Sequence, residues 1–357
     1  MDMFAALFAL QAVMAAPNAD PFEFFQPSVI VSVEDRRRLD RGEPIARVLP
    51  GRDLEVAVFA AIPADIDGDR LVAWMRRIED LKKSSYVLAI GRFSDPPRLE
   101  DLAGLALDDE ELSEIVKCRP GHCRLKLAGI EMTQLQREAA EAGSDWKPVL
   151  QDAFRHVVLQ RVTAYLADGH AALPPYENHS GHVWPATRFA SVLGHSVFLS
   201  EHVPRFAEHL SRYPRTPMPG VESFVYWSKE RLASKAIISA THVSILRNHD
   251  AGLPDALVAG KEIFATHYVN ASLGLTAIVG GEPGTPNYLV YMNRSEVDIL
   301  GGAFGGLVRW FVQRRLRTEA ADVLRGLRRR LESGEPPARA TARNETQRSL
   351  ALCRAIE

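Results

Sequence analysis

Two pairs of histidines are the side chains in this sequence whose type and spacing could support chemistry. In "ENHSGHVW", His179 and His182 stand three residues apart, and Glu177 lies beside them. Imidazole and carboxylate groups at that spacing could share a zinc ion, as in a metal-dependent hydrolase. No further ligands follow at a recognised spacing, so a hydrogen-bonded surface loop is the alternative interpretation. On this basis we predict no metal and no cofactor.

The second pair, His242 and His267, falls within "ISATHVSIL" and "FATHYVNASLGL", two segments typical of β-strands. Every second residue of a strand shares one face, so either segment could present polar groups to a cavity. Those groups would orient a small molecule in an apolar pocket, or serve a cyclase-like catalyst. The alternative is that both histidines are hydrogen-bonded within the sheet or at its edge. The residues that we predict to bind a ligand on the sheet are Trp227, His242, His267, Tyr268 and Asn270.

Motifs for nucleotide binding and for common hydrolases are absent from the sequence. It contains no GxSxG elbow, no Walker loop and no HExxH motif. The glycine-rich "GGEPG" at 280–284 precedes a strand-like segment and not a helix, so it is not expected to cradle a phosphate. A net charge of -2 over 357 residues gives no reason to expect binding to nucleic acid.

The cysteine spacing and the amino terminus both favour an exported protein. In "CRPGHC", a Pro-Gly turn could bring Cys118 and Cys123 within disulfide distance; a metal site with His122, or two free thiols, are the alternatives. Residues 1–19 contain an apolar run shorter than the roughly 20 residues of a membrane span, which is typical of a secretory signal peptide. Asp2 stands where a signal peptide has a basic residue, so a true start upstream, or a buried helix in place of a signal peptide, are the alternatives. We expect a periplasmic or secreted protein.

Apolar periodicity predicts the elements that position these residues. A strand over 53–65 opens the domain and leads into a helix capped by Asp67, and a second strand follows over 86–93. The segment from about 95 to 215 is predicted to be mainly helical, with a strand at 123–127 and a loop at "ENHSGHVW". The later segments are rich in β-branched residues separated by Gly and Pro turns, which predicts an antiparallel meander.

The stretch at 301–332 predicts one long amphipathic helix, ended by the prolines of "SGEPP". Val308, Val312 and Leu316 belong to its apolar stripe, and arginines occupy the other side. We expect the stripe to pack on the core of the protein, while the basic side faces water or contacts a membrane surface. The polar tail at 336–357 is expected to be disordered.

The order of these elements resembles that of the START-like helix-grip folds, whose curved sheet wraps a carboxy-terminal helix around an apolar cavity. The matching parts are "EVAVFAAIPADIDGDRLVAWMRRIEDLKK" and "NYLVYMNRSEVDILGGAFGGLVRWFVQRRLR", and the likeness lies in pattern more than in identical residues. The helical segment departs from the family pattern and would be a large insertion. The chain is also similar in appearance to exported bacterial envelope proteins.

The resemblance implies an α+β fold in which an antiparallel sheet grips the long C-terminal amphipathic helix. A single START-like domain would span 28–335, with the helical insertion at about 95–215. Val308, Val312 and Leu316 would line the cavity, and the partner would be a hydrophobic small molecule or lipid. We therefore predict non-enzymatic binding or transport of a lipid-like molecule in the bacterial envelope. An enzyme that uses the histidines above, or an envelope module whose insertion docks a protein partner, are the alternatives.

Overall fold

The computed structural model describes residues 20–179, 181–232, 235–250, 252–280, 286–301 and 305–334. Side chains at 232, 305–313 and 315–318 lie outside the described part, although the backbone there is described. The predicted signal peptide at 1–19, the tail at 336–357 and the side chains of Val308, Val312 and Leu316 therefore lie outside the described residues and stay predictions.

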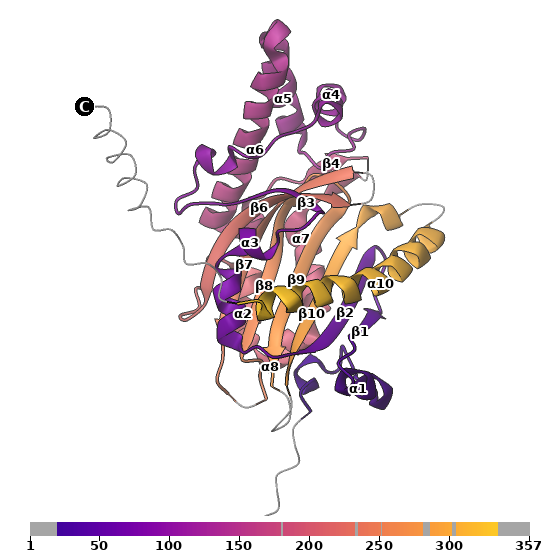
Figure 1. Ribbon diagram of the computed structural model, residues 1–357. Helices are drawn as coiled ribbons and strands as arrows, with labels where there is room; N and C mark the ends of the chain where they lie inside the picture. The colour runs from indigo at the N-terminus through magenta and orange to yellow at the C-terminus, as the bar shows by residue number, and fades with distance from the viewer. Residues whose placement is uncertain are drawn as a thin grey trace, which may run out of the picture.

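A single eight-stranded antiparallel sheet dominates the described part of the chain (Figure 1). Its strands are β1 (Ile45–Leu49), β2 (Glu55–Ala64), β3 (Val87–Arg92), β6 (Glu222–Leu232), β7 (Lys235–Arg247), β8 (Ala256–Ala265), β9 (Val269–Val279) and β10 (Asn287–Val297). They lie in the order β1-β2-β10-β9-β8-β7-β6-β3, and the sheet is open because β1 and β3 form opposite edges. The predicted meander is thus extended by β2 and β1 at one side and by β3 at the other.

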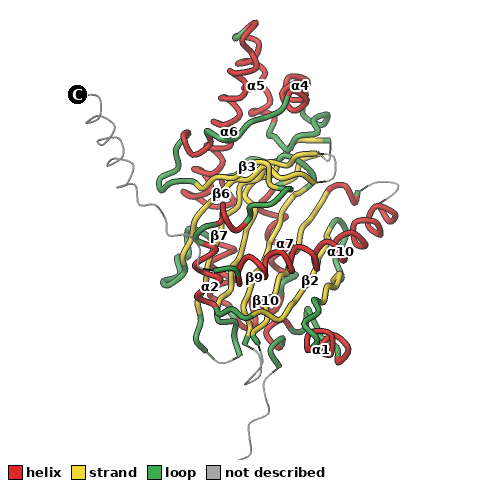
Figure 2. The backbone as a smooth tube through the Cα atoms, in the orientation of Figure 1, coloured by secondary structure: helices red, strands yellow, loops and turns green. Residues whose placement is uncertain are grey.

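Three helices lie on one face of the sheet, which we call the inner face (Figure 2). Helices α2 (Gly68–Met75) and α3 (Ile78–Leu81) follow β2, and α10 (Gly305–Glu332) crosses the face beside β2 and β1. The side chain of Asp67 accepts a hydrogen bond from the N–H of Arg70 (2.8 Å), so the predicted cap begins α2. Leu324 and Leu331 of α10 are buried with apolar residues of β2 and α2, so the last turns of α10 close against the sheet.

The arginines of α10 do not all face water, contrary to the prediction. Arg325 is exposed, but Arg328 donates a hydrogen bond to the carbonyl of Pro63 (3.2 Å), and Arg330 donates to the carbonyl of Leu81. These bonds tie the last turns of α10 to the ends of β2 and α3. Within the described ranges, no helix is both long enough and apolar enough to span a membrane.

The opposite face, which we call the outer face, is covered by the segment between β3 and β6 and by the residues before β1. Leu135 of one helix and Phe154 of the next are fully buried and belong to the same apolar cluster as the outer-face residues Trp227 and Ala240. The predicted fold class is therefore confirmed: the protein is α+β, with an antiparallel sheet and a large helical insertion. The covering elements are η1 (Glu23–Phe25), α1 (Val33–Asp40), η2 (Leu99–Leu102), α4 (Asp109–Lys117), α5 (Gly129–Glu141), η3 (Gly143–Asp145), α6 (Trp146–Asp168), η4 (Gly169–Ala172), β4 (Tyr176–Asn178), β5 (Gly181–Val183), α7 (Pro185–Gly194), α8 (Val197–His202) and α9 (Pro204–Arg212).

Three local predictions are wrong. Residues 123–127 form no strand in the described structure. Isolated main-chain hydrogen bonds, such as the one from Lys126 N to Thr266 O (2.9 Å), hold this segment, and they do not form a β-ladder. The segment "ENHSGHVW" forms the hairpin β4–β5 and not a loop. The domain does not open at 53–65, since η1, α1 and β1 come first; α1 begins at a capping box of Ser32 and Asp35.

Candidate functional site

A set of half-buried residues lies in the middle of the inner face. In a sheet whose face is fully packed against helices, residues at this place would be buried. On four adjacent strands, β7 to β10, these residues stay partly open to water, although the outer-face residues between them are buried. Successive residues of a strand alternate between faces, so water reaches the centre of the sheet from the inner side only. We call this set the inner patch; it consists of Ser239, Thr241, Gly260, Glu262, Ser272, Gly274, Tyr291 and Asn293.

The register of the strands places the inner patch on one face. Thr241 lies opposite Glu262, and Gly260 lies opposite Gly274, which in turn lies opposite Asn293. Around the patch the same face is apolar and packs with α2 and α10. The bordering residues are Val58, Ala60, Val243, Val258, Ile278 and Leu289.

Glu262 carries the carboxyl group of the inner patch. Within the part of the chain that the structure describes, no hydrogen bond or ion pair reaches this group. Burial, followed by the nearby charge of Glu230, raises the pKa of Glu262 to about 8. The carboxyl group is therefore protonated at neutral pH, and its O–H can donate a hydrogen bond to an oxygen atom of a ligand.

An ion pair stands beside the inner patch. Lys82 Nζ lies 2.6 Å from Glu230 Oε1 and 3.2 Å from Tyr226 Oη. Burial alone would raise the pKa of Glu230, but the ammonium group of Lys82 holds it below its ordinary value. Glu230 is therefore charged at neutral pH while Glu262 is protonated, so two neighbouring carboxyl groups have different states on one face.

Gly260 and Gly274 leave the floor of the inner patch without side chains. A Cβ atom at Gly274 would lie 3.6 Å from Asn293 Nδ2, and one at Gly260 would lie 3.5 Å from Thr241 Cγ2, both ordinary contact distances. Neither glycine has a positive φ, so the backbone does not require glycine there. Glycine weakens a strand interior and often marks a place where another molecule or backbone approaches closely, and these two glycines lie opposite each other on neighbouring strands.

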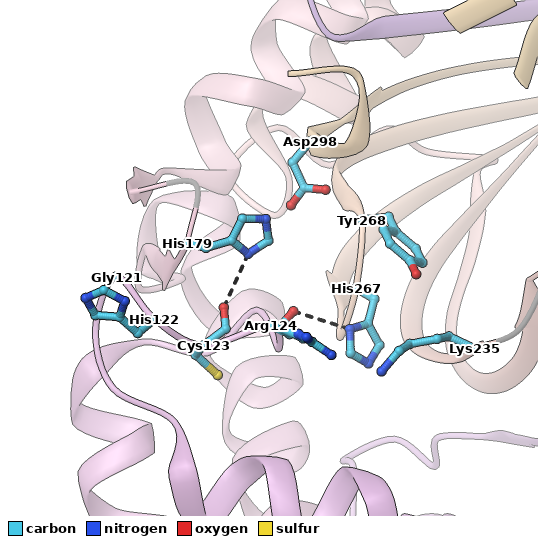
Figure 3. Close-up of a pocket in the computed structure, with 9 residues that line it drawn as sticks. All are labelled: Gly121, His122, Cys123, Arg124, His179, Lys235, His267, Tyr268 and Asp298. Carbon is cyan, nitrogen blue, oxygen red and sulfur yellow. Dashed lines mark hydrogen bonds between the residues drawn. The ribbon is translucent and has the colours of Figure 1, made fainter. Parts of the chain in front are cut away.

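A second feature is a pocket of about 490 Å³ at the end of the sheet where β8 turns into β9 (Figure 3). We call it the rim pocket. Its walls come from the loop after α4, the β4–β5 hairpin, the start of β7, the β8–β9 turn and the end of β10. The lining residues are Gly121, His122, Cys123, Arg124, His179, Lys235, His267, Tyr268 and Asp298.

The predicted disulfide builds one wall of the rim pocket. Cys118 and Cys123 are joined, with their Cα atoms 4.5 Å apart. Main-chain bonds from Gly121 N to Glu177 O (2.8 Å) and from His179 N to Cys123 O (3.2 Å) connect this loop to the β4–β5 hairpin. The wall is therefore held by covalent and hydrogen bonds at the same place.

A buried lysine fixes the back of the rim pocket. Lys126 is fully buried, and its Nζ lies 2.8 Å from Asp298 Oδ2 and 2.6 Å from Asn270 Oδ1. Asn270 donates in turn to Glu296 (3.1 Å), and Asn178 donates to Asp298 (3.3 Å). The carboxylate of Asp298 thus lines the pocket while a cation behind it balances its charge.

The β8–β9 turn sets two further side chains of the rim pocket. Tyr268 has a φ of 61°, uncommon for a residue other than glycine, and its carbonyl accepts a hydrogen bond from Asp298 N (2.9 Å). His267 Nδ1 lies 3.3 Å from the carbonyl oxygen of Arg124, which assigns the ring proton to Nδ1. Burial lowers the pKa of His267, so its ring is neutral at neutral pH and Nε2 is a hydrogen-bond acceptor.

The structure divides the residues that the sequence predicts to bind a ligand. His267 and Tyr268 line the rim pocket, and Asn270 lies directly behind it. Trp227 and His242 lie on the outer face, where Trp227 Nε1 donates to the carbonyl of Asp101 (2.8 Å). The inner patch contains none of these five residues, because the strand register sends their side chains elsewhere.

His242 belongs to a sealed cluster around Lys261. Tyr165 Oη and His242 Nδ1 share a hydrogen bond (2.8 Å), and Lys261 Nζ donates to the carbonyl of Leu210 (2.7 Å). No carboxylate pairs with Lys261 in the described part of the molecule. Burial lowers the pKa of Lys261 to about 7 and that of His242 to about 3, and it also lowers the pKa of His170.

The alternative zinc site does not assemble in the described residues. His182 lies opposite Glu177 in the β4–β5 hairpin and is exposed, whereas His179 lines the rim pocket. Across the described ranges, no three side chains of His, Cys, Asp or Glu are placed to hold a metal ion together.

Sequence patterns alone do not identify the inner patch. One signal was available in "ALVAGKEIFA", where alternation sends the adjacent charges of Lys261 and Glu262 to opposite faces of an otherwise apolar strand. A charge on either face of a central strand of a packed sheet needs a partner or a special environment. Which face was open to water could be learned only from the packing of α10.

Comparisons with known proteins give a partial likeness and no family. No family model matches the chain, and no curated protein matches it. The structure of TTHA0849 from Thermus thermophilus aligns with 14% identity and a TM-score of 0.24, over 42% of this chain and 90% of that chain. The di-domain ARO/CYC StfQ from the steffimycin biosynthetic pathway aligns with 13% identity and a TM-score of 0.24, over 42% of this chain and 46% of that chain. Neither likeness assigns a ligand or an activity to this protein.

Proposed function

We propose that this protein binds a small, largely apolar molecule carrying a carbonyl or hydroxyl oxygen, and that the molecule lies in the inner patch beside α10. The observation that supports the proposal is a water-accessible floor with two glycines, surrounded by apolar side chains, beneath the protonated carboxyl group of Glu262. Apolar walls with a few placed polar groups are the usual composition of ligand sites. The protonated carboxyl group of Glu262 would donate a hydrogen bond to the oxygen atom of the ligand.

The order of the elements and the disulfide add support. The chain runs from β2 through two helices and β3 to the meander and α10, an order similar to that of START-like helix-grip proteins, whose ligand lies between sheet and last helix. Such binding needs no nucleophile or metal. The disulfide between Cys118 and Cys123 favours an oxidising compartment, so we place the protein in the periplasm or outside the cell.

Filling the floor of the inner patch is expected to abolish binding without unfolding the protein. Gly274→Val places methyl groups where the ligand would lie, while its Cβ atom meets only ordinary contacts. Valine also suits a strand, so the free energy of unfolding should change by less than about 1 kcal/mol. Affinity for Nile red, a neutral apolar dye with a carbonyl oxygen, should fall by roughly tenfold or more, as measured by its fluorescence.

Gly280→Val is the matched control, because Gly280 follows the end of β9 and is exposed. Among the described residues, apart from its chain neighbours, no atom lies within 4 Å of a Cβ atom at this position. It should bind Nile red as the wild type does. Organic extraction and mass spectrometry of the protein from its native host would then identify the natural ligand. Equal dye affinity in the wild type and in Gly274→Val would contradict binding at the inner patch.

Alkaline pH is expected to weaken binding through Glu262. The pKa of Glu262 is raised to about 8, so the carboxyl group loses its proton and its donor capacity as the pH rises through that value. The pKa of the neighbouring Glu230 is lowered by Lys82 and that of Lys82 is raised, so neither of these two groups changes charge near pH 8. Glu262→Gln keeps a donor at all pH values. Dye affinity should therefore fall between pH 7 and pH 9 in the wild type and stay level in the variant; parallel decreases would reject the role of Glu262.

A further inference from the structure

We infer that the rim pocket is a second binding site, and that it selects an oxyanion that still carries a proton, of which hydrogen phosphate is the common example. The site is separate from the inner patch and does not depend on the function proposed for it. Its lining combines cationic donors with neutral or anionic acceptors, and both kinds are fixed by the surrounding structure.

The cationic donors of the rim pocket are Arg124 and Lys235. Figure 3 shows their charged ends on either side of the His267 ring. Glu114 lies 4.0 Å from Arg124 Nε and 3.8 Å from Lys235 Nζ, too far for a hydrogen bond to either. Lys235 Nζ donates one hydrogen bond, to the exposed Glu110 (3.1 Å). An exposed pair of this kind is weak, so the N–H groups of both cations stay available to an anion.

The acceptor that the rim pocket offers is His267 Nε2. The bond from His267 Nδ1 to the carbonyl of Arg124 leaves the lone pair of Nε2 to a ligand, on a residue that is only 3% exposed. The carboxylate of Asp298 also lines the pocket, and it accepts hydrogen bonds from Lys126 and Asn178. Hydrogen phosphate can donate its O–H to Nε2 while its other oxygens accept from the cations. Sulfate carries no proton at neutral pH, so one of its oxygens would meet the lone pair of Nε2.

Discrimination against sulfate follows from the cost of leaving a buried acceptor without a donor. A site built around a ligand hydroxyl rejects an analogue that lacks it far more strongly than an apolar site rejects a size difference. The Tyr268 backbone and the disulfide restrict movement of the surrounding loops, so the pocket has little freedom to relax around the wrong anion.

Isothermal titration calorimetry with inorganic phosphate and with sulfate, at neutral pH and with ionic strength fixed by chloride, tests this inference. We expect saturable phosphate binding, and sulfate binding at least about tenfold weaker. His267→Asn keeps a donor for the Arg124 carbonyl but removes Nε2, so it should lose the preference for phosphate. Lys235→Met should weaken binding of both anions.

Lys147→Met is the matched control for charge, because Lys147 is exposed on α6, forms an ion pair with the exposed Asp109 and does not line the rim pocket. It should bind phosphate as the wild type does. Urea unfolding of each variant reports whether the fold is intact, and this control does not depend on the inner patch. Absence of saturable phosphate binding to the wild type, or equal affinity for sulfate and phosphate, would overturn the inference.

Discussion

Replacement of Lys261 by methionine is expected to stabilise the protein by on the order of 3–4 kcal/mol at pH 6. Lys261 is fully buried on the outer face, and within the described residues its neighbours are histidines, tyrosines and a carbonyl group but no carboxylate. Burial lowers its pKa from 10.5 to about 7. Methionine has a similar shape and carries no charge to desolvate, and the lost hydrogen bond to Leu210 offsets part of the gain.

The sign of the pH dependence follows from the two pKa values. The unfolded chain binds the proton of Lys261 more tightly than the folded chain does, so wild-type stability rises as the pH increases from about 7 to about 10.5. The penalty is complete below about pH 7 and absent above about pH 10.5. The advantage of Lys261→Met should therefore be full at pH 6 and shrink toward alkaline pH.

Urea unfolding at several pH values measures this advantage directly. His170 and His242 lie in the same cluster, and burial lowers the pKa of both, so their protonation at acid pH destabilises the wild type and the variant. Lys83→Met, at an exposed lysine, should change stability by less than about 0.5 kcal/mol at every pH. A variant that is less stable than the wild type at pH 6 would show that Lys261 has a compensating partner.

Replacement of Lys126 by methionine is expected to have the opposite effect, a loss of about 3–5 kcal/mol. Lys126 is as buried as Lys261, but its ammonium group forms an ion pair with Asp298 and donates a hydrogen bond to Asn270 Oδ1. Its removal leaves the buried carboxylate of Asp298 without its cation, and removing one member of a buried pair costs more than the pair itself contributes.

A double variant separates charge from packing at this position. In Lys126→Met combined with Asp298→Asn, no buried charge is left unpaired at this place, so most of the lost stability should return. Urea unfolding of the two single variants and the double variant gives the coupling free energy. Simple additivity of the single effects would mean that the two side chains are not coupled, against the 2.8 Å contact.

The helices and strands with strong local signals could be predicted from the sequence. The apolar run before Asp67 gives β2, the Asp67 side chain caps α2, and the stripe at 301–332 gives α10. Each of these signals depends on residues close together in the chain. The disulfide of Cys118 and Cys123 is local in the same sense, since a five-residue separation and a turn suffice.

His267 and Tyr268 of the rim pocket were singled out from the sequence, but the assembly of either site could not be predicted, because each depends on register and on distant segments. The rim pocket brings residues near 122 together with residues near 235, 267 and 298. The sequence predicted His242 to bind a ligand because it lies on a strand. The face of the sheet on which its side chain lies depends on the pairing of β7 with β8 and on the bulge next to Ala240. Alternation in a single strand cannot say which of its faces meets α10.

The large insertion leaves the sheet and rejoins it at neighbouring points. Phe93 N, just after β3, donates a hydrogen bond to Val225 O in β6, and Arg92 lies opposite Tyr226. In topology, the whole segment is therefore only the connection of a β-hairpin. An evolving or engineered chain can lengthen, shorten or exchange that connection without re-threading the domain, provided that the replacement still shields the outer side of the strands.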